Sequence, residues 1–259
     1  MDEPVNFDVK ERIATLTLNR PKVFNGLNKK VLQFLAERLV ECSIDNHIAG
    51  VVITGEGKAF CAGGDLKYIS TYSNNYGDAF HILGAQYNQA ILEIRRMPKP
   101  VVAAINGLAA GGGFSMALAC DFRIMETSAV LRQAYTTNGL SIDGGGTFTL
   151  PRLVGLARAM EIIAFDRPIS AKTALSWGLV TEVVEDGKAL KKALKLIKGQ
   201  MERPISSFAM CKKLINDSFN TPFETQLEKE RKALSWCADQ PNGREGIDAF
   251  LKKRKPVYA

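Results

Sequence analysis

The chain predicts an α/β fold with a helical C-terminal region, and two observations lead to this expectation. Short apolar runs such as residues 50–54 and 101–105 alternate with longer amphipathic stretches, and each crossover is long enough for a parallel connection. After about residue 190 the strand-like runs stop and helical patterns dominate. We therefore expect a core over residues 1–190 and a helical region over residues 191–259.

The first half of the chain supplies most of the predicted strands. Residues 7–9 and 13–18 alternate between polar and apolar side chains, which is typical of a hairpin at the edge of a sheet. The elements expected next are a helix over 28–42, a buried strand over 50–54, a mobile connection over 70–77, a helix from there to Ile94, and a buried strand over 101–105.

The second half begins with a buried helix and then becomes increasingly helical. Phe114 to Ala119 carries only small and apolar residues, which favours a helix inside the core. Short strands are expected over 121–125 and 129–132, followed by a glycine-dense segment over 139–151. The predicted helices after it cover 156–165, 170–177, 187–201, 205–217, 223–236 and 244–251.

Composition narrows the classes of function. The 259 residues carry a net charge of +7, which suits an anionic partner such as a nucleic acid or coenzyme A. No nucleic-acid-binding motif is present, so direct nucleic-acid recognition is not expected. Five scattered cysteines and two histidines show no metal-ligand spacing. With no signal peptide or membrane-span pattern, we expect a cytoplasmic protein with reduced thiols and no metal.

Two glycine-rich turns follow predicted strands. Gly111-Gly112-Gly113 comes after the strand over 101–105 and opens the buried helix, so free backbone N–H groups would point in front of that helix. The second turn, over residues 57–66, follows the strand over 50–54. The glycines could serve only close packing. Two such turns could also place amides from different loops on one oxygen atom.

These stretches together resemble the crotonase (enoyl-CoA hydratase/isomerase) superfamily. The matching residues are Phe60-Cys61-Ala62-Gly63-Gly64-Asp65-Leu66, and Ala104-Ile105-Asn106-Gly107 through Gly111-Gly112-Gly113. The resemblance runs over essentially the whole chain, from Leu18-Asn19-Arg20-Pro21 to Lys253-Arg254-Lys255-Pro256. It implies a crotonase-like spiral of ββα units, with a C-terminal helical region that mediates assembly into a homotrimer or a dimer of trimers.

The resemblance also implies a substrate and a binding site. The substrate would be an acyl-CoA thioester, with CoA as part of the substrate and no separate cofactor. Its carbonyl oxygen would accept hydrogen bonds from the N–H groups of Gly64 and Gly112. Ala62, Gly63, Gly64, Asp65 and Leu66 would lie against the CoA adenine and pantetheine. Lys253 would lie near the CoA phosphates, although residues 252–255 could instead be a solvated tail.

The acid–base residues depart from the hydratase pattern of this superfamily. Hydratases use two glutamates, and the corresponding positions are Ser115 and Tyr135, which we expect to contact substrate. Asp143 is the acidic residue left in the region, and its position matches an aspartate used by some isomerases of the superfamily. Taken alone, Asp143 would be interpreted as a turn or helix-capping residue. The absence of both glutamates, together with the two glycine-rich turns, favours Asp143 as the base. Tyr135 and Phe148 either shape the acyl pocket or are core aromatics.

The sequence therefore predicts a double-bond isomerase in which Asp143 moves a proton from C2 to C4 of a 3-enoyl-CoA. Residues 143–155 and 225–231 resemble the phenylacetate-pathway enoyl-CoA isomerases. Three alternatives stay open. The first is a C–C bond-forming or ring-cleaving enzyme that uses Ser141 with Asp143, similar to dihydroxynaphthoyl-CoA synthases. The second is a hydratase with a relocated carboxylate such as Glu126 or Glu161. The third is a non-catalytic acyl-CoA-binding or RNA-binding protein.

Overall fold

The computed structural model describes residues 3–73 and 75–258, and its centre is a six-stranded sheet. The strand order is β1-β2-β3-β5-β7-β10. The strands are β1 (Val5–Lys10), β2 (Ile13–Leu18), β3 (Gly50–Gly55), β5 (Val101–Ile105), β7 (Phe122–Glu126) and β10 (Glu182–Val184). β1 and β2 form the predicted antiparallel edge hairpin, and every other neighbouring pair is parallel. The structure thus confirms the alternating α/β arrangement.

A second sheet is built from much shorter strands in the order β4-β6-β8-β9. They are β4 (Ala59–Cys61), β6 (Leu108–Ala110), β8 (Val130–Arg132) and β9 (Ile169–Ser170). Of these, the sequence predicts only β8. β4 falls inside the glycine-rich turn over residues 57–66, β6 directly precedes Gly111-Gly112-Gly113, and β10 of the larger sheet is missed as well. Runs of two or three residues are too short to show the alternation that identifies a strand.

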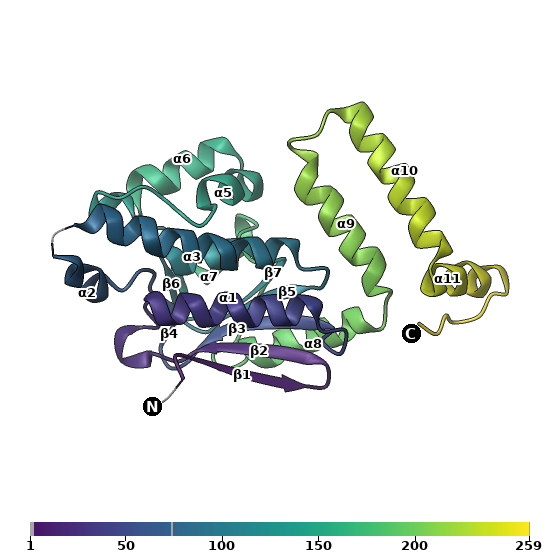
Figure 1. Cartoon of the computed structure of the whole chain (residues 1–259), viewed down its shortest axis with the longest axis horizontal. Helices are drawn as coiled ribbons and strands as arrows, with labels where there is room; N and C mark the ends of the chain where they lie inside the picture. Colours follow the sequence, from purple (N-terminus) through teal and green to yellow (C-terminus); the bar gives the residue numbers. More distant parts are fainter. Residues whose placement is uncertain (1–2, 74, 259) are drawn as a thin grey trace.

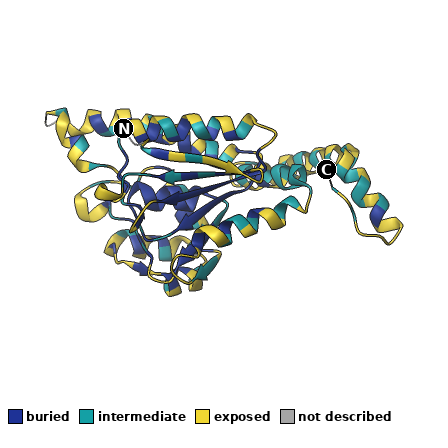
Figure 2. Cartoon of the chain, turned by 90° about the horizontal axis from the view of Figure 1, so that it is seen from below, coloured by how far each residue is buried: buried dark blue, intermediate teal, exposed yellow. Residues whose placement is uncertain are grey.

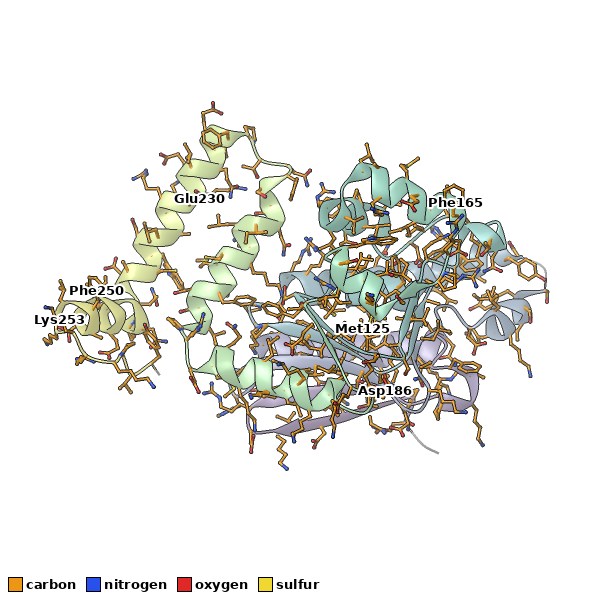
Figure 3. The ribbon with its side chains drawn as sticks, turned by 180° about the vertical axis from the view of Figure 1, so that it is seen from behind. Met125, Phe165, Asp186, Glu230, Phe250 and Lys253 are labelled. Carbon is orange, nitrogen blue, oxygen red and sulfur yellow. The ribbon has the colours of Figure 1, made fainter. Side chains whose placement is uncertain are left out.

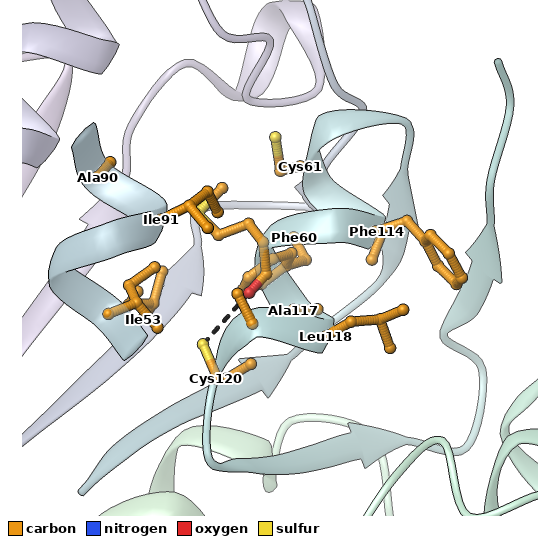
Figure 4. Close-up of a cluster of buried hydrophobic side chains, with 14 of the residues drawn as sticks. Ile53, Phe60, Cys61, Ala90, Ile91, Phe114, Ala117, Leu118 and Cys120 are labelled. Carbon is orange, nitrogen blue, oxygen red and sulfur yellow. Dashed lines mark hydrogen bonds between the residues drawn. The ribbon is translucent and has the colours of Figure 1, made fainter. Parts of the chain in front are cut away.

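Helices cover both faces of the six-stranded sheet. α1 (Lys29–Ile44) and α3 (Tyr76–Arg96) lie side by side over one face (Figure 1). α4 (Gly112–Ala119) is buried along its whole length, as its small apolar residues predict. Figure 4 shows Ile91 of α3 and Leu118 of α4 in the core between these helices and the strands, where the Cys120 thiol donates a hydrogen bond to the carbonyl of Met116 (3.4 Å).

α8 (Ala189–Met201) contributes to a second cluster of core residues. Its buried Ala189, Ala193 and Ile197 pack with Val52 and Val102 of the sheet. The boundary expected between residues 190 and 191 falls inside α8, which packs on the sheet. The buried strands and the exposed outer surfaces of the helices are visible in Figure 2.

Three C-terminal helices project from this core as an arm (Figure 1). They are α9 (Ile205–Ser218), α10 (Phe223–Asp239) and α11 (Pro241–Leu251). Lys212 of α9 joins the arm to the core, because its buried Nζ donates to Asp121 Oδ2 (2.7 Å) and to the carbonyl of Ile94 (2.9 Å). Large apolar side chains stay exposed on the arm, including those of Phe219, Phe223, Leu234 and Phe250.

Four further α-helices complete the described part of the chain. They are the short α2 (Leu66–Ile69), then α5 (Gly146–Val154), α6 (Leu156–Phe165) and α7 (Ala171–Ser176). α5 lies within the glycine-dense segment, where glycines and Pro151 hide a helical pattern from the sequence. Within the part of the chain that is described, no helix has the length and apolarity needed to cross a bilayer.

Candidate active site

The two glycine-rich turns meet because the strands before them are paired. β4 and β6 are parallel neighbours, so their carboxyl ends lie side by side and the two turns leave the sheet together. Gly63 is at the point of contact: a Cβ added there would lie 2.9 Å from the amide nitrogen of Gly112. Its φ of +91° is also a conformation that other residues rarely adopt. Glycine at 63 therefore allows the close approach of the two loops.

The amides of Gly64 and Gly112 are free to bind a ligand oxygen. Leu27 pairs with the turn over residues 57–66 through its own N–H to the carbonyl of Gly63 (2.8 Å) and through its carbonyl to the N–H of Asp65 (2.9 Å). The N–H of Gly64, between these two contacts, faces the other side of the extended chain. Gly112 is the first residue of α4, where an N–H has no partner inside the helix. Within the described chain, neither amide donates a hydrogen bond to another residue.

Both glycines line a largely apolar cavity of about 120 Å³. Its wall comes from the two glycine-rich turns, from α2 and the N-terminal half of α3, and from residues 134–143. The lining residues are Leu27, Leu32, Ala62, Gly64, Leu66, Ile69, Phe80, Leu83, Gly84, Tyr87, Gly111, Gly112, Ala134, Tyr135, Asn138, Leu140 and Asp143. Asp143 is the one carboxylate among these described lining residues, so it is the candidate base.

Asp143 is held by a chain of hydroxyl groups. Its Oδ1 accepts a hydrogen bond from the Tyr135 hydroxyl (2.5 Å), which also lies 3.2 Å from Ser115 Oγ. Asp143 keeps exposed surface at the cavity. Even so, desolvation by the surrounding protein raises the pKa of its carboxyl, and the Tyr135 hydrogen bond acts in the opposite direction. Burial and the nearby carboxylate raise the pKa of Tyr135, so this hydroxyl stays a donor.

The structure does not assign Asp143 a capping role. α5 begins at Gly146 with Gly145 as its N-cap, and no side chain caps it. The contact of Asp143 with the start of α5 is made by its backbone carbonyl, which accepts from the N–H of Gly146 (3.0 Å). The carboxylate therefore remains available to the cavity.

Tyr87 is a site residue that sequence reasoning placed only on the packing face of a helix. Its hydroxyl donates a hydrogen bond to the carbonyl of Gly112, and its ring leaves no room for a Cβ on Gly144. Tyr87 thus lies between the free amide of Gly112 and the loop that carries Asp143. Its side chain is buried, and this burial holds the pKa of Tyr87 well above its usual value. Helical spacing alone cannot distinguish such a residue from an ordinary core aromatic.

The other predicted site residues divide into three groups. Ala62 and Leu66 line the cavity, whereas Gly63 does not line it and instead packs closely against the backbone of the Gly111–Gly112 turn. The Asp65 carboxylate serves the fold instead, since it caps α2 by accepting from the N–H of Tyr68 (3.0 Å) and pairs with Arg20 (2.8 Å). Lys253 lies beyond α11 at the end of the arm, whereas α2 and the cavity lie at the opposite end of the molecule (Figures 1 and 3).

Four further residues of the sequence analysis lie outside the cavity lining. Ser115 is fully buried behind Tyr135. Phe148 instead packs beneath the guanidinium of Arg152, whose carbon lies 3.4 Å from the ring centroid. Glu126 accepts from the N–H of Ala189 (3.2 Å), and the exposed Glu161 pairs with Arg158 (2.9 Å). A relocated hydratase carboxylate at position 126 or 161 is therefore not supported.

Two free amides and one carboxylate among the described residues of one cavity define a site that can polarise a carbonyl and move protons beside it. Comparison with known proteins agrees with this class. Residues 8–259 match the enoyl-CoA hydratase/isomerase profile. The chain belongs to the enoyl-CoA hydratase/isomerase family, within the crotonase superfamily, and an acyl-CoA substrate is consistent with that membership.

Similar proteins carry both kinds of name. The chain is 35% identical to the 1,2-epoxyphenylacetyl-CoA isomerase of Escherichia coli (strain K12) over 251 residues, 96% of each chain. It is 33% identical to the short-chain-enoyl-CoA hydratase of Clostridium acetobutylicum over 245 residues, 94% of this chain and 93% of the other. The crystal structure of an enoyl-CoA hydratase from Polaromonas sp. JS666 superimposes with a TM-score of 0.93 at 37% identity, covering 98% of this chain and 99% of that one.

Proposed function

We propose that the chain is an enoyl-CoA isomerase that shifts a double bond from C3–C4 to C2–C3 of an acyl-CoA thioester. The supporting observation is that Asp143 is the one carboxylate among the described residues that line the cavity, which also contains the two free amides. A proton shift needs one group that first accepts a proton and then returns it. Hydration by the family's usual route uses two carboxylates to orient and activate water.

In the proposed reaction the thioester oxygen accepts hydrogen bonds from Gly64 N–H and Gly112 N–H. Asp143 takes a proton from C2, and the C2 electron pair forms the C1–C2 double bond of a dienolate whose negative charge resides on that oxygen. When the dienolate collapses, C4 takes the proton back from Asp143, and the double bond is left between C2 and C3. The N-terminus of α4 adds a favourable dipole for the oxyanion.

Tyr135 supports this role by binding only one carboxylate oxygen. Its hydroxyl donates to Oδ1, and among the described residues no side chain donates to Oδ2. Oδ2 is therefore the oxygen we assign to the proton transfer. The raised pKa of Asp143 favours a carboxylate that both accepts and returns a proton near neutral pH.

The test is a spectrophotometric assay with trans-3-hexenoyl-CoA, in which the conjugated 2-enoyl thioester absorbs as it forms. We expect the wild type to isomerise this substrate and Asp143→Asn to lose about 10²- to 10⁴-fold in kcat, the usual contribution of a general base. Glu161→Gln is the matched control, because Glu161 is an exposed carboxylate outside the cavity. Full activity in Asp143→Asn, or conversion of a 2-enoyl-CoA to the 3-hydroxy thioester at a comparable rate, would contradict the proposal.

A second candidate is an isomerisation that opens a strained ring beside the thioester. The 35% identity to a 1,2-epoxyphenylacetyl-CoA isomerase over 96% of each chain supports this possibility. The same amides would then hold the carbonyl oxygen while the ring rearranges. Turnover of an epoxide-bearing phenylacetyl thioester without turnover of trans-3-hexenoyl-CoA would favour this candidate.

We also propose that the arm mediates association with further copies of the chain, as a homotrimer or a dimer of trimers. The exposed apolar side chains of α9–α11 support this, because monomeric proteins rarely leave so many large apolar groups in water. Lys253 could contact a CoA phosphate only from another copy, since it lies far from the cavity of its own chain. Light scattering after size exclusion should give a multiple of 28.4 kDa, and a mass of 28.4 kDa would refute the association.

A further inference from the structure

One face of α3 lines the cavity, and one of its positions carries no side chain. Phe80, Leu83, Gly84 and Tyr87 all line the cavity, and their spacing of i, i+3, i+4 and i+7 places them on one face of the helix. Three of these residues are large and apolar. Gly84 leaves the space between them without a side chain, and we refer to this space as the Gly84 notch.

The backbone gives no reason for a glycine at this position. Gly84 lies in the middle of a 21-residue helix, its φ is not positive, and a Cβ added there would meet nothing within 4 Å. Glycine in a helix interior destabilises the helix relative to alanine. The position therefore keeps a residue that weakens the helix and leaves open space beside the candidate active site.

The notch lies close to the reacting part of the site. Tyr87 lies three residues after Gly84 on the same face of α3. It contacts Gly112 and the backbone at Gly144, next to Asp143. Three residues of helix advance about 4.5 Å along the axis. The notch therefore lies within one helical turn of Tyr87, the residue that contacts Gly112. Phe80 and Tyr87 place an aromatic side chain on each side of the notch along this face.

We propose that Gly84 is a specificity-determining residue that admits an acyl group carrying a ring at C3–C4. This inference rests on the proposed isomerase function, because it assigns a substrate class to the same cavity. A straight acyl chain does not need the extra width that a missing side chain provides. A six-membered ring does, and apolar aromatic neighbours suit its faces.

The experiment compares two 3-enoyl thioesters that differ in width. One is trans-3-hexenoyl-CoA, and the other is cyclohex-1-enylacetyl-CoA, whose C3 and C4 belong to the ring. We expect Gly84→Leu to lower kcat/KM for the ring-bearing thioester by about 10- to 200-fold, the range found when a hydrophobic pocket changes by a small apolar group. Its kcat/KM for trans-3-hexenoyl-CoA should fall by a clearly smaller factor, because the straight chain needs less of the space beside Gly84.

Gly199→Leu is the matched control. Gly199 also lies inside a helix with nothing within 4 Å of an added Cβ, but it is on an exposed part of α8 away from the cavity. Both variants should fold and should melt no lower than the wild type. The proposal is overturned if Gly84→Leu treats both thioesters alike, or if Gly199→Leu shows the same change in preference.

A binding measurement separates this proposal from the proposed reaction. Calorimetry with the saturated thioesters cyclohexylacetyl-CoA and hexanoyl-CoA requires no chemistry. If the wild type isomerises neither 3-enoyl thioester, the proposed function fails, yet a selective loss of cyclohexylacetyl-CoA affinity in Gly84→Leu still supports the notch. If Gly84→Leu leaves the ratio of the affinities for cyclohexylacetyl-CoA and hexanoyl-CoA unchanged, Gly84 does not determine specificity, whatever the reaction is.

Discussion

Gly63→Ala provides a direct test of how the two glycine-rich turns form the site. An alanine at this position must adopt a φ of +91°, and the left-handed region costs an L-residue about 1–2 kcal/mol. Its Cβ would also lie 2.9 Å from Gly112 N and 3.0 Å from the carbonyl oxygen of Ala110. Both contacts are backbone atoms that cannot move aside alone, and overpacking of this kind costs about 1–3 kcal/mol. We expect Gly63→Ala to lower the free energy of unfolding by about 2–5 kcal/mol as these two costs add.

The functional effect should exceed what lost stability explains. Moving Gly64 and Gly112 apart removes at least one hydrogen bond to the thioester oxygen, which typically lowers kcat by about 10²- to 10³-fold. The assays are urea unfolding and turnover of trans-3-hexenoyl-CoA by the folded variant. Gly187→Ala is the control, because Gly187 has a similar φ of +75° with nothing within 4 Å of an added Cβ. A wild-type kcat in Gly63→Ala would refute the proposed link between Gly63 and the two amides. An equal loss of stability in Gly187→Ala would refute the contribution of the close contacts at Gly63.

Three further predictions concern ionisable groups. In Tyr135→Phe the pKa of Asp143 should rise, because a hydrogen bond that lowers this pKa is lost. The acid limb of the kcat–pH profile should then move to higher pH. An unmoved limb would contradict the assignment of Asp143 as the base. Asp143→Asn should melt at a higher temperature than the wild type at pH 7. The reason is that folding raises the pKa of Asp143, so ionisation of this carboxyl destabilises the native state. The difference in melting temperature between the two proteins should narrow as the pH falls toward about 4. Lys212→Met should cost about 3–5 kcal/mol in urea unfolding, because it leaves the Asp121 carboxylate, whose side chain is only 16% exposed, without its cation. Adding Asp121→Asn should recover part of that loss, and no recovery would argue against the uncompensated charge.

Much of the fold could be predicted from the sequence because its longer elements carry clear periodic patterns. The hairpin of β1 and β2, the helix over 29–44 and the buried α4 all follow from the spacing of apolar residues. The strands of two or three residues could not be found in this way. β4 and β6 matter most among them, because their pairing brings the two glycine-rich turns together.

The candidate site was predictable to the extent that it is encoded in local motifs. Glycines after buried strands predicted free amides, and the structure places Gly64 and Gly112 at one cavity. The roles of Tyr87 and Gly84 depend on which side of α3 faces those glycines, and that is a matter of tertiary packing. Likewise, Ser115 and Tyr135 are 20 residues apart in sequence, so only the fold shows that their hydroxyl groups meet.

The hydroxyl pair also bears on why one carboxylate could suffice in this site. A second carboxylate near Asp143 would raise the pKa of both groups, because like charges disfavour ionisation together. Ser115 and Tyr135 are neutral, so desolvation is what raises the pKa of Asp143, while hydrogen bonds from the Tyr135 hydroxyl and from the backbone of Asp143 lower it. In the proposed isomerase, this single carboxyl group would take the proton from C2 and return it to C4. Water activation on the hydratase pattern calls for a second carboxylate, so the same substitution that favours a proton shift works against hydration.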